Sequence, residues 1–151
     1  MIDCTPLGLC SWDFQLQTAE NSAVLEYSWL TETGSISTNH TRYEVDKLGP
    51  FSGTWNLLKD NKPLMQAVKN SAFSRSFTIR YGRDEYHLAA ESAFGRTMNL
   101  DGPNGRAVIA PKHAFTRRAT ITGSLPPFEV SALSFWLVGI LWRRAQNASS
   151  S

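Results

Sequence analysis

The sequence predicts a mainly β domain, a closed antiparallel barrel of about 10–12 strands wrapped around a hydrophobic C-terminal α-helix. First, short apolar or alternating runs recur between turn residues at even intervals along most of the chain. Second, residues 130–142 carry no charge and are apolar on every side at helical pitch. Third, strands that close around such a helix bury its whole surface and leave no exposed sheet edge.

In the first half of the chain, apolar residues alternate with polar ones at 12–17, 23–27 and 41–45, which predicts strands. Residues 55–58 and 64–68 flank a turn-forming segment and predict a further pair. The second of these is also compatible with a helical turn, because Leu, Met, Gln and Ala favour helix.

The second half of the chain repeats this pattern. Residues 76–80 and 85–89 flank Tyr81-Gly82-Arg83-Asp84, which predicts a hairpin. Residues 97–100 and 106–110 flank a five-residue loop, 101–105, whose Gly, Pro and Asn residues favour turns.

The helix follows at residues 130–142, and thirteen residues span roughly 20 Å, less than the roughly 30 Å hydrocarbon core of a bilayer. Pro126 or Pro127 suits its first turn, and Glu129 and the pair Arg143-Arg144 complement its dipole. A core helix is therefore expected. The alternative is a small membrane-associated protein that uses residues 128–144 as a C-terminal anchor.

A chain of 151 residues with 42% hydrophobic and 19% charged residues fits one globular domain. We expect an N-terminal extension at 1–10, a single barrel domain at 11–145 and a disordered tail at 146–151, where Ala and Ser predominate. No basic segment precedes an apolar one at the start, so a cytoplasmic location is expected.

Charge is unevenly distributed along the chain. Residues 1–68 hold four Lys/Arg against eight Asp/Glu, whereas residues 69–151 hold eleven against five. The C-terminal half is therefore the expected partner of phosphates or anionic lipid headgroups, which would place the protein at the inner face of the membrane. Charges that are scattered in the fold are the alternative.

Several motifs, in their order along the chain, resemble the tubby-like C-terminal superfamily, which includes tubby, the phospholipid scramblases and the LURP-one-related proteins. They are Tyr43-Glu44-Val45, Gly53-Thr54-Trp55, Ala67-Val68-Lys69 before 73–79, the turn 101–106, Lys112 with Arg117-Arg118-Ala119, Phe135-Trp136-Leu137 and Trp142-Arg143-Arg144. The resemblance covers roughly residues 11–145. It implies a small bacterial-type member with a closed barrel around its C-terminal helix, in a superfamily whose members include phosphoinositide-binding and membrane-acting proteins.

The residues give no sign of catalysis. His40, His87 and His113 lack a second ligand at metal spacing, and Cys4 and Cys10 lack a C-x-x-C spacing. No nucleophile elbow or phosphate-binding loop is present. We therefore expect no enzyme, no metal and no cofactor; an active site assembled from distant residues is the remaining alternative.

Three basic residues are the candidate ligand-binding residues: Lys112, Arg117 and Arg118, beside a predicted strand. The arginine fork suits phosphate oxygens. Alternation, however, places Arg117 and Arg118 on opposite faces. The alternative to a ligand-binding cluster is therefore that one of the two arginines pairs with a carboxylate or a helix carbonyl within the fold.

The sequence thus predicts a monomeric, non-enzymatic binding or scaffold module. Its expected partners are an anionic phospholipid, a phosphorylated ligand or another protein. Nucleic acid is not expected, because five tryptophans in so small a barrel belong to its core.

Overall fold

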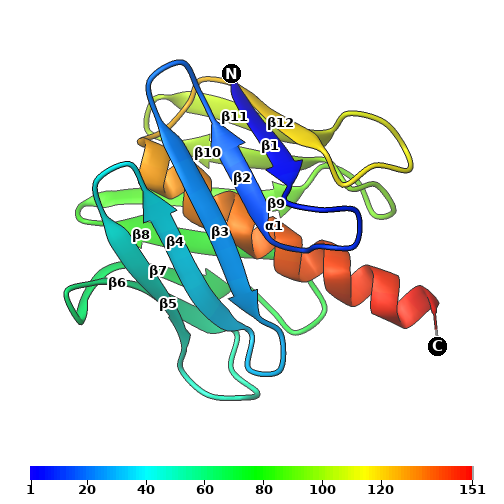
Figure 1. Cartoon of the computed structure of the whole chain (residues 1–151). Coiled ribbons are helices and arrows are strands. Elements are labelled where there is room, and N and C mark those ends of the chain that lie inside the picture. Colours follow the sequence, from blue (N-terminus) through cyan, green and yellow to red (C-terminus); the bar gives the residue numbers. More distant parts are fainter. Residues whose placement is uncertain (151) are drawn as a thin grey trace.

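The computed structural model describes residues 1–150, which form twelve strands and one helix (Figure 1). The strands are β1 (Ile2–Pro6), β2 (Phe14–Gln17), β3 (Ser22–Ser28), β4 (Thr33–Thr38), β5 (Arg42–Lys47), β6 (Thr54–Lys59), β7 (Lys62–Lys69), β8 (Ser76–Tyr81), β9 (Asp84–Ala90), β10 (Met98–Gly102), β11 (Gly105–Pro111) and β12 (Ala119–Gly123). The helix α1 spans Phe128–Ser149.

Each strand pairs antiparallel with the next along the chain, and β1 pairs with β12 to close the barrel. The predicted fold class is confirmed. Tyr81 pairs with Asp84 across a turn in which Gly82 takes a positive φ of 61°, as the hairpin motif predicted. Residues 64–68 belong to strand β7 and not to a helical turn. Strands β10 and β11 extend into the predicted loop 101–105 and leave only residues 103–104 between them.

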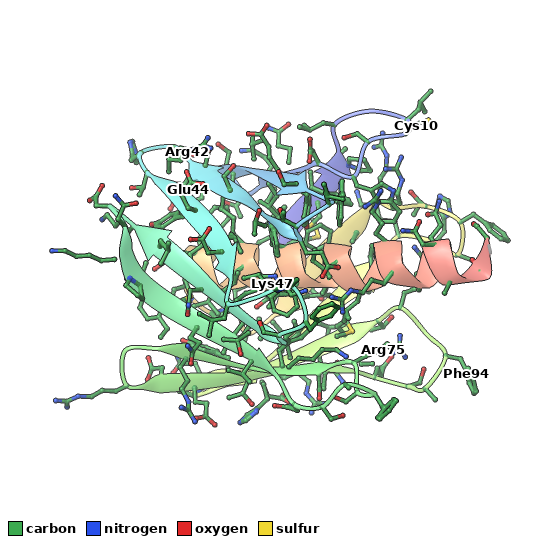
Figure 2. The ribbon with its side chains drawn as sticks, turned by 90° about the horizontal axis from the view of Figure 1, so that it is seen from below. Cys10, Arg42, Glu44, Lys47, Arg75 and Phe94 are labelled. Carbon is green, nitrogen blue, oxygen red and sulfur yellow. The ribbon has the colours of Figure 1, made fainter. Side chains whose placement is uncertain are left out.

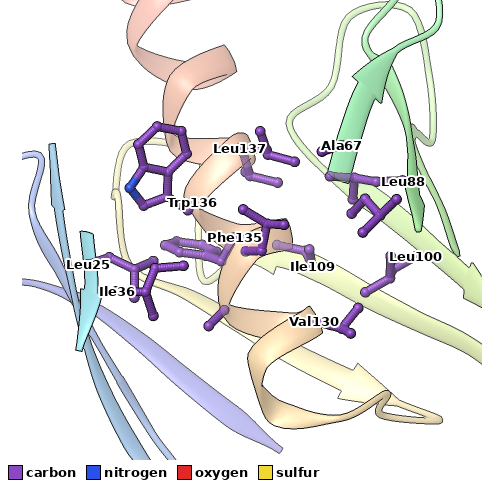
Figure 3. Packing of buried hydrophobic residues seen from close by; sticks show 14 of the residues in the cluster. Leu25, Ile36, Ala67, Leu88, Leu100, Ile109, Val130, Phe135, Trp136 and Leu137 are labelled. Carbon is purple, nitrogen blue, oxygen red and sulfur yellow. The ribbon is translucent and has the colours of Figure 1, made fainter. Parts of the chain in front are cut away.

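The helix runs through the barrel, and its residues Val130–Trp142 are all buried. Apolar side chains from the inner face of the strands surround it, so that Leu25 and Ile36 lie on one side and Leu88 and Leu100 on another (Figure 3). Alternate strand residues point inward because the side-chain period of a strand is two. Each buried Leu, Ile or Phe contributes about 1.5–3 kcal/mol. No face of residues 130–142 is exposed to water.

Hydrogen bonds from aromatic side chains fix the helix relative to the wall. The Tyr27 hydroxyl donates to the Trp136 carbonyl at 2.8 Å, and the Trp136 indole donates to the Glu26 carbonyl at 3.2 Å. The rings of Tyr27 and Trp136 are stacked with centroids 4.6 Å apart. Burial raises the pKa of the Tyr27 hydroxyl well above its ordinary value, so Tyr27 remains a donor.

Two predicted boundaries are wrong. Residues 2–6 of the expected extension 1–10 form β1, because the sheet needs a strand to join β2 to β12. Residues 146–149 of the expected disordered tail continue α1. Arg143 and Arg144 consequently lie within the helix and do not complement the dipole of its last turn. Within residues 1–150, no helix is long and apolar enough to cross a membrane.

Gly139→Ala tests how closely the helix fits its wall. Alanine normally favours a helix interior over glycine by about 0.8–1.0 kcal/mol. Here a Cβ at residue 139 would lie 2.3 Å from the Tyr27 hydroxyl oxygen, so we expect net destabilisation of about 1–3 kcal/mol in urea unfolding. The control is Ser131→Ala, which removes a buried hydroxyl without a partner in residues 1–150 and should be neutral or stabilising. An increase in stability for Gly139→Ala would contradict the packing described.

Candidate functional site

The candidate site is the end of the barrel from which α1 emerges, called the helix-exit end. Because the strands form a meander, every second connection lies at this end. These connections are the β1–β2 loop (7–13), the β3–β4 loop (29–32), the β5–β6 loop (48–53), the β7–β8 loop (70–75), the β9–β10 loop (91–97) and the β11–β12 loop (112–118). They surround the last turns of α1 (Figure 1).

Five of these loops share one backbone conformation. The first residue of each donates its N–H to the carbonyl six residues later, as in Lys112 to Arg118 at 2.8 Å. The equivalent pairs are Leu7 with Asp13, Leu48 with Thr54, Asn70 with Ser76 and Glu91 with Thr97. A four-residue turn within each loop points its central side chains away from the barrel.

The loop tips carry large apolar side chains in full contact with solvent. Phe51, Phe73 and Phe94 are 100% exposed and Phe115 is 98% exposed, all at the third position of their turns. Leu9 and Leu30 are 98% and 99% exposed in the two remaining loops. In Figure 2, Phe94 and Cys10 lie at the same end as the exposed terminus of α1, and Phe94 points outward. Nothing within the fold requires these side chains to be apolar.

Three arginines connect neighbouring loops through backbone carbonyls. Arg75 donates to the Gly95 carbonyl at 2.6 Å, and Arg96 donates to the Thr116 carbonyl at 2.7 Å. Arg117 donates to the carbonyls of Gly8 and Leu9 and lies over the Trp12 ring at 5.3 Å. Each arginine therefore holds the next loop in place around the ring.

The predicted site residues do not converge on one ligand. Lys112 forms an ion pair with Asp3 at 3.2 Å. Arg117 donates to backbone carbonyls of the β1–β2 loop and so has the structural role that the sequence left open for one of the two arginines. Arg118 is exposed, and its side chain has no partner among residues 1–150. All three nevertheless lie at the helix-exit end.

Glu32 is the centre of a second charged group at this end. Its carboxylate accepts from Arg144 Nε at 2.7 Å and from Lys47 Nζ at 2.8 Å. Burial alone would raise the pKa of Glu32, but these two hydrogen-bonded cations lower it below its ordinary value of 4.5. Lys47 and Arg144 also lie over the Trp55 ring, at 5.2 and 5.9 Å.

Two clefts lie beside this group. The first, of about 490 Å³, lies between the β3–β4 loop and the last turns of α1, where Arg143 lies 4.2 Å over the Trp29 ring. The second, of about 390 Å³, lies between the β5–β6 and β7–β8 loops. Lys47, Pro50 and Arg144 line both, so the clefts adjoin.

Positive charge exceeds negative charge at the helix-exit end. Its basic residues are Lys47, Lys69, Arg75, Arg96, Lys112, Arg117, Arg118, Arg143 and Arg144, and its acidic residues are Asp13, Glu32, Glu91 and Asp3, which pairs with Lys112. By contrast, the outer wall over β3–β5 carries Glu26, Glu44 and Asp46 against one basic residue, Arg42, which forms an ion pair with Glu44 at 2.9 Å. The chain therefore has a basic end and an acidic flank.

Possible metal-ligand groups and the buried cysteine bear on metal binding and nucleophilic chemistry. Within the described part of the chain, no group of three His, Cys, Asp or Glu residues could hold a metal ion. Burial raises the pKa of the Cys4 thiol, which is the opposite of what a nucleophile needs. At the opposite end of α1, the Tyr81 hydroxyl donates a hydrogen bond to the Glu129 carboxylate. This bond raises the pKa of the Tyr81 hydroxyl to about 12.

The apolar tips were not among the predicted site residues, although the sequence carries a pattern that indicates them. Ala-Phe-x-Arg begins at residues 72, 93 and 114, a spacing of 21 residues. The recurrence corresponds to one hairpin of the barrel per repeat. It identifies both the exposed phenylalanine and the arginine that holds the next loop.

Comparison with protein-family models, with curated proteins and with solved structures finds no match.

The different roles of Arg117 and Arg118 predict different effects of their removal. Arg117→Ala leaves the Gly8 and Leu9 carbonyls without their donor and should lower the free energy of unfolding by about 1–3 kcal/mol. Arg118→Ala removes the same charge from an exposed position and should change stability by less than about 0.5 kcal/mol. Chemical denaturation measures both. Equal losses would contradict the assignment of Arg117 to loop closure.

The pKa of Glu32 predicts an acid-sensitive contribution to stability. Because folding lowers this pKa, the contribution is complete above the ordinary value of 4.5 and is lost as the pH falls through the lower folded-state value. Urea unfolding of the native chain should therefore weaken more steeply below pH 4.5 than that of Glu32→Gln. Parallel pH profiles for the two chains would contradict this assignment.

Proposed function

We propose that this protein is a non-enzymatic module that docks on anionic membrane surfaces by its helix-exit end. The observation that carries the proposal is the set of four almost fully exposed phenylalanines at equivalent turn positions around a basic end. The loop tips enter the interfacial region of the bilayer, and the basic residues contact lipid headgroups. The inner face of the cytoplasmic membrane, which carries anionic lipids, is the corresponding location.

The apolar tips suit a lipid surface better than a protein surface. Each phenylalanine lies on a separate loop, preceded only by a small Ala or Pro, whereas a protein interface has a contiguous apolar core. A bilayer accepts separate side chains, because each one gains from leaving water independently of the others. Phenylalanine and leucine beside Lys and Arg are the residues that interfacial membrane segments use.

Charge gives the docking its orientation. Each Lys or Arg near an anionic bilayer contributes about 1 kcal/mol. Basic residues such as Arg118 and Arg143 lie at the end that carries the tips. On the β3–β5 wall Arg42 pairs with Glu44, and Glu26 and Asp46 leave a net negative charge that would repel an anionic surface. Binding of the barrel to the bilayer by its helix-exit end is therefore favoured, and binding by the β3–β5 wall is disfavoured.

This proposal moves the membrane contact from residues 128–144 to the loops. The apolar face of α1 is already occupied by the barrel wall and has no surface left for lipid. Membership of the tubby-like superfamily remains part of the proposal. A closed barrel around a C-terminal helix is the architecture that the resemblance implies, and it supports that membership without selecting a function.

Vesicle sedimentation tests the docking. Full burial of a Phe side chain is worth about 1.5–3 kcal/mol, so each Phe→Ser change at Phe51, Phe73, Phe94 or Phe115 should weaken partitioning about tenfold. The four changes together should abolish sedimentation with vesicles of phosphatidylcholine and phosphatidylserine. The matched control replaces the same four residues by Leu, which should retain binding.

Two results would refute the proposal. One is equal recovery of the native chain in the supernatant with and without anionic lipid. The other is concentration-dependent self-association that the Phe→Ser changes remove, which would assign the tips to contacts between copies of the chain. Thermal unfolding of each variant verifies that the barrel is intact.

A further inference from the structure

The β5–β6 loop differs from the β7–β8, β9–β10 and β11–β12 loops at the position where these three carry an arginine. Arg75, Arg96 and Arg117 occupy the sixth position of their loops and reach the next loop, whereas Gly53 occupies it here. A Cβ on residue 53 would lie only 3.0 Å from the Lys69 Cβ. No side chain therefore crosses from Gly53 towards the β7–β8 loop, and this is where the second cleft lies.

Lys69 makes the contacts to the β7–β8 loop that an arginine at residue 53 would make. Its Nζ donates to the carbonyls of Ser71 at 3.2 Å and Ala72 at 3.0 Å. Arg96 and Arg117 bind the equivalent carbonyls of their own neighbouring loops. The β7–β8 loop is thus held without the space between the loops being filled.

The second cleft is lined by cations and by no carboxylate. Its lining includes Lys47, Lys69 and Arg144 together with the hydroxyl-bearing Ser52 and Ser71. Glu32 neutralises only one of the two cations that it binds. Burial, and next the nearby Arg144, lower the pKa of the Lys69 ammonium, in keeping with positive charge that is not balanced here.

Hydrogen-bond donors remain available in the cleft. Arg144 uses Nε and Nη2 for Glu32, and its Nη1 has no partner within residues 1–150. The Lys69 ammonium has three N–H groups, of which two donate to the Ser71 and Ala72 carbonyls and one remains available. The volume of about 390 Å³ is that of a small-ligand pocket.

We propose that the cleft between the β5–β6 and β7–β8 loops binds a phosphomonoester group, with Lys69 and Arg144 as its principal ligands. The cleft has three cations, Lys47, Lys69 and Arg144, and Glu32 is the single carboxylate at its edge. The net charge of two positive units matches a phosphate dianion. Guanidinium and ammonium groups bind phosphate oxygens through charge-assisted hydrogen bonds. The group belongs either to a lipid headgroup or to a small phosphorylated molecule. Phe51 lies at the edge of the cleft, whereas Phe73, Phe94 and Phe115 do not line it, and binding does not depend on these three.

Amide chemical shifts of the ¹⁵N-labelled chain test the site directly. Titration with inorganic phosphate at constant ionic strength, against chloride, should give saturable shifts centred on Gly53, Lys69 and Ser71. Lys69→Gln and Arg144→Gln should each raise the dissociation constant for phosphate about tenfold or more, since a hydrogen bond to a charged group is worth about 1.5–3 kcal/mol. Arg118→Gln removes one charge from the same end and should change it less than twofold.

Vesicles separate the two sources of the phosphate. Phosphatidic acid presents a phosphomonoester and phosphatidylserine a phosphodiester. With vesicles of equal surface charge, Lys69→Gln should lose the preference for phosphatidic acid if the group is a lipid headgroup. If the native chain has no such preference but binds inorganic phosphate, the ligand is a free phosphorylated molecule.

The site and the docking fail separately. Native-chain shifts that do not saturate, or that spread over the basic residues of the helix-exit end, would overturn the phosphate site even if vesicles still bind. An equal loss of phosphate affinity in Arg118→Gln would do the same. A chain with Phe73, Phe94 and Phe115 replaced by Ser, none of which lines the cleft, should still bind inorganic phosphate, so failure of the docking proposal leaves this result intact.

Discussion

The structure depends on the burial of a helix that is apolar on all sides. An amphipathic helix needs a wall on one face, but residues 130–142 need one all around. A closed barrel is the arrangement of a single sheet that supplies it, and closure in turn requires β1 to pair with β12. The helix and the wall are each incomplete without the other, because the inward side chains of the strands, such as Leu25 and Ile36, form one buried cluster with the side chains of the helix.

The same constraint shapes the two ends of the barrel. Since the interior is filled, ligands and partners have access only to the outer wall and the loops. The repeated arginine contacts stiffen the helix-exit end, and the repeated turns point phenylalanines away from it. The one loop that carries Gly53 in place of an arginine leaves a cationic cleft.

Much of the fold could be predicted because its determinants are local. The period-two runs, the Tyr81–Asp84 turn and the uncharged stretch 130–142 each specify a strand, a hairpin or a buried helix without reference to distant residues. The strand Ile2–Pro6 was not predicted, although Ile2 and Cys4 alternate with polar residues as in the other strands. Its role in closing the barrel depends on its partners β2 and β12, which the local pattern does not identify. The candidate site was predicted only in its charge. Arg117 and Arg118 are adjacent in sequence, yet whether each meets carbonyls or water depends on the β1–β2 loop, more than a hundred residues away.

The position of α1 after all twelve strands has a consequence for folding during synthesis. Every strand leaves the ribosome before the helix that fills the barrel, so the inward-facing side chains have no native core to pack against at that stage. Pairing of β1 with β12 also joins residues that are more than a hundred positions apart, which makes closure a late event. The nascent sheet therefore exposes both its edges and its apolar face until residues 130–142 emerge, and it is in this interval that a chaperone would be needed most.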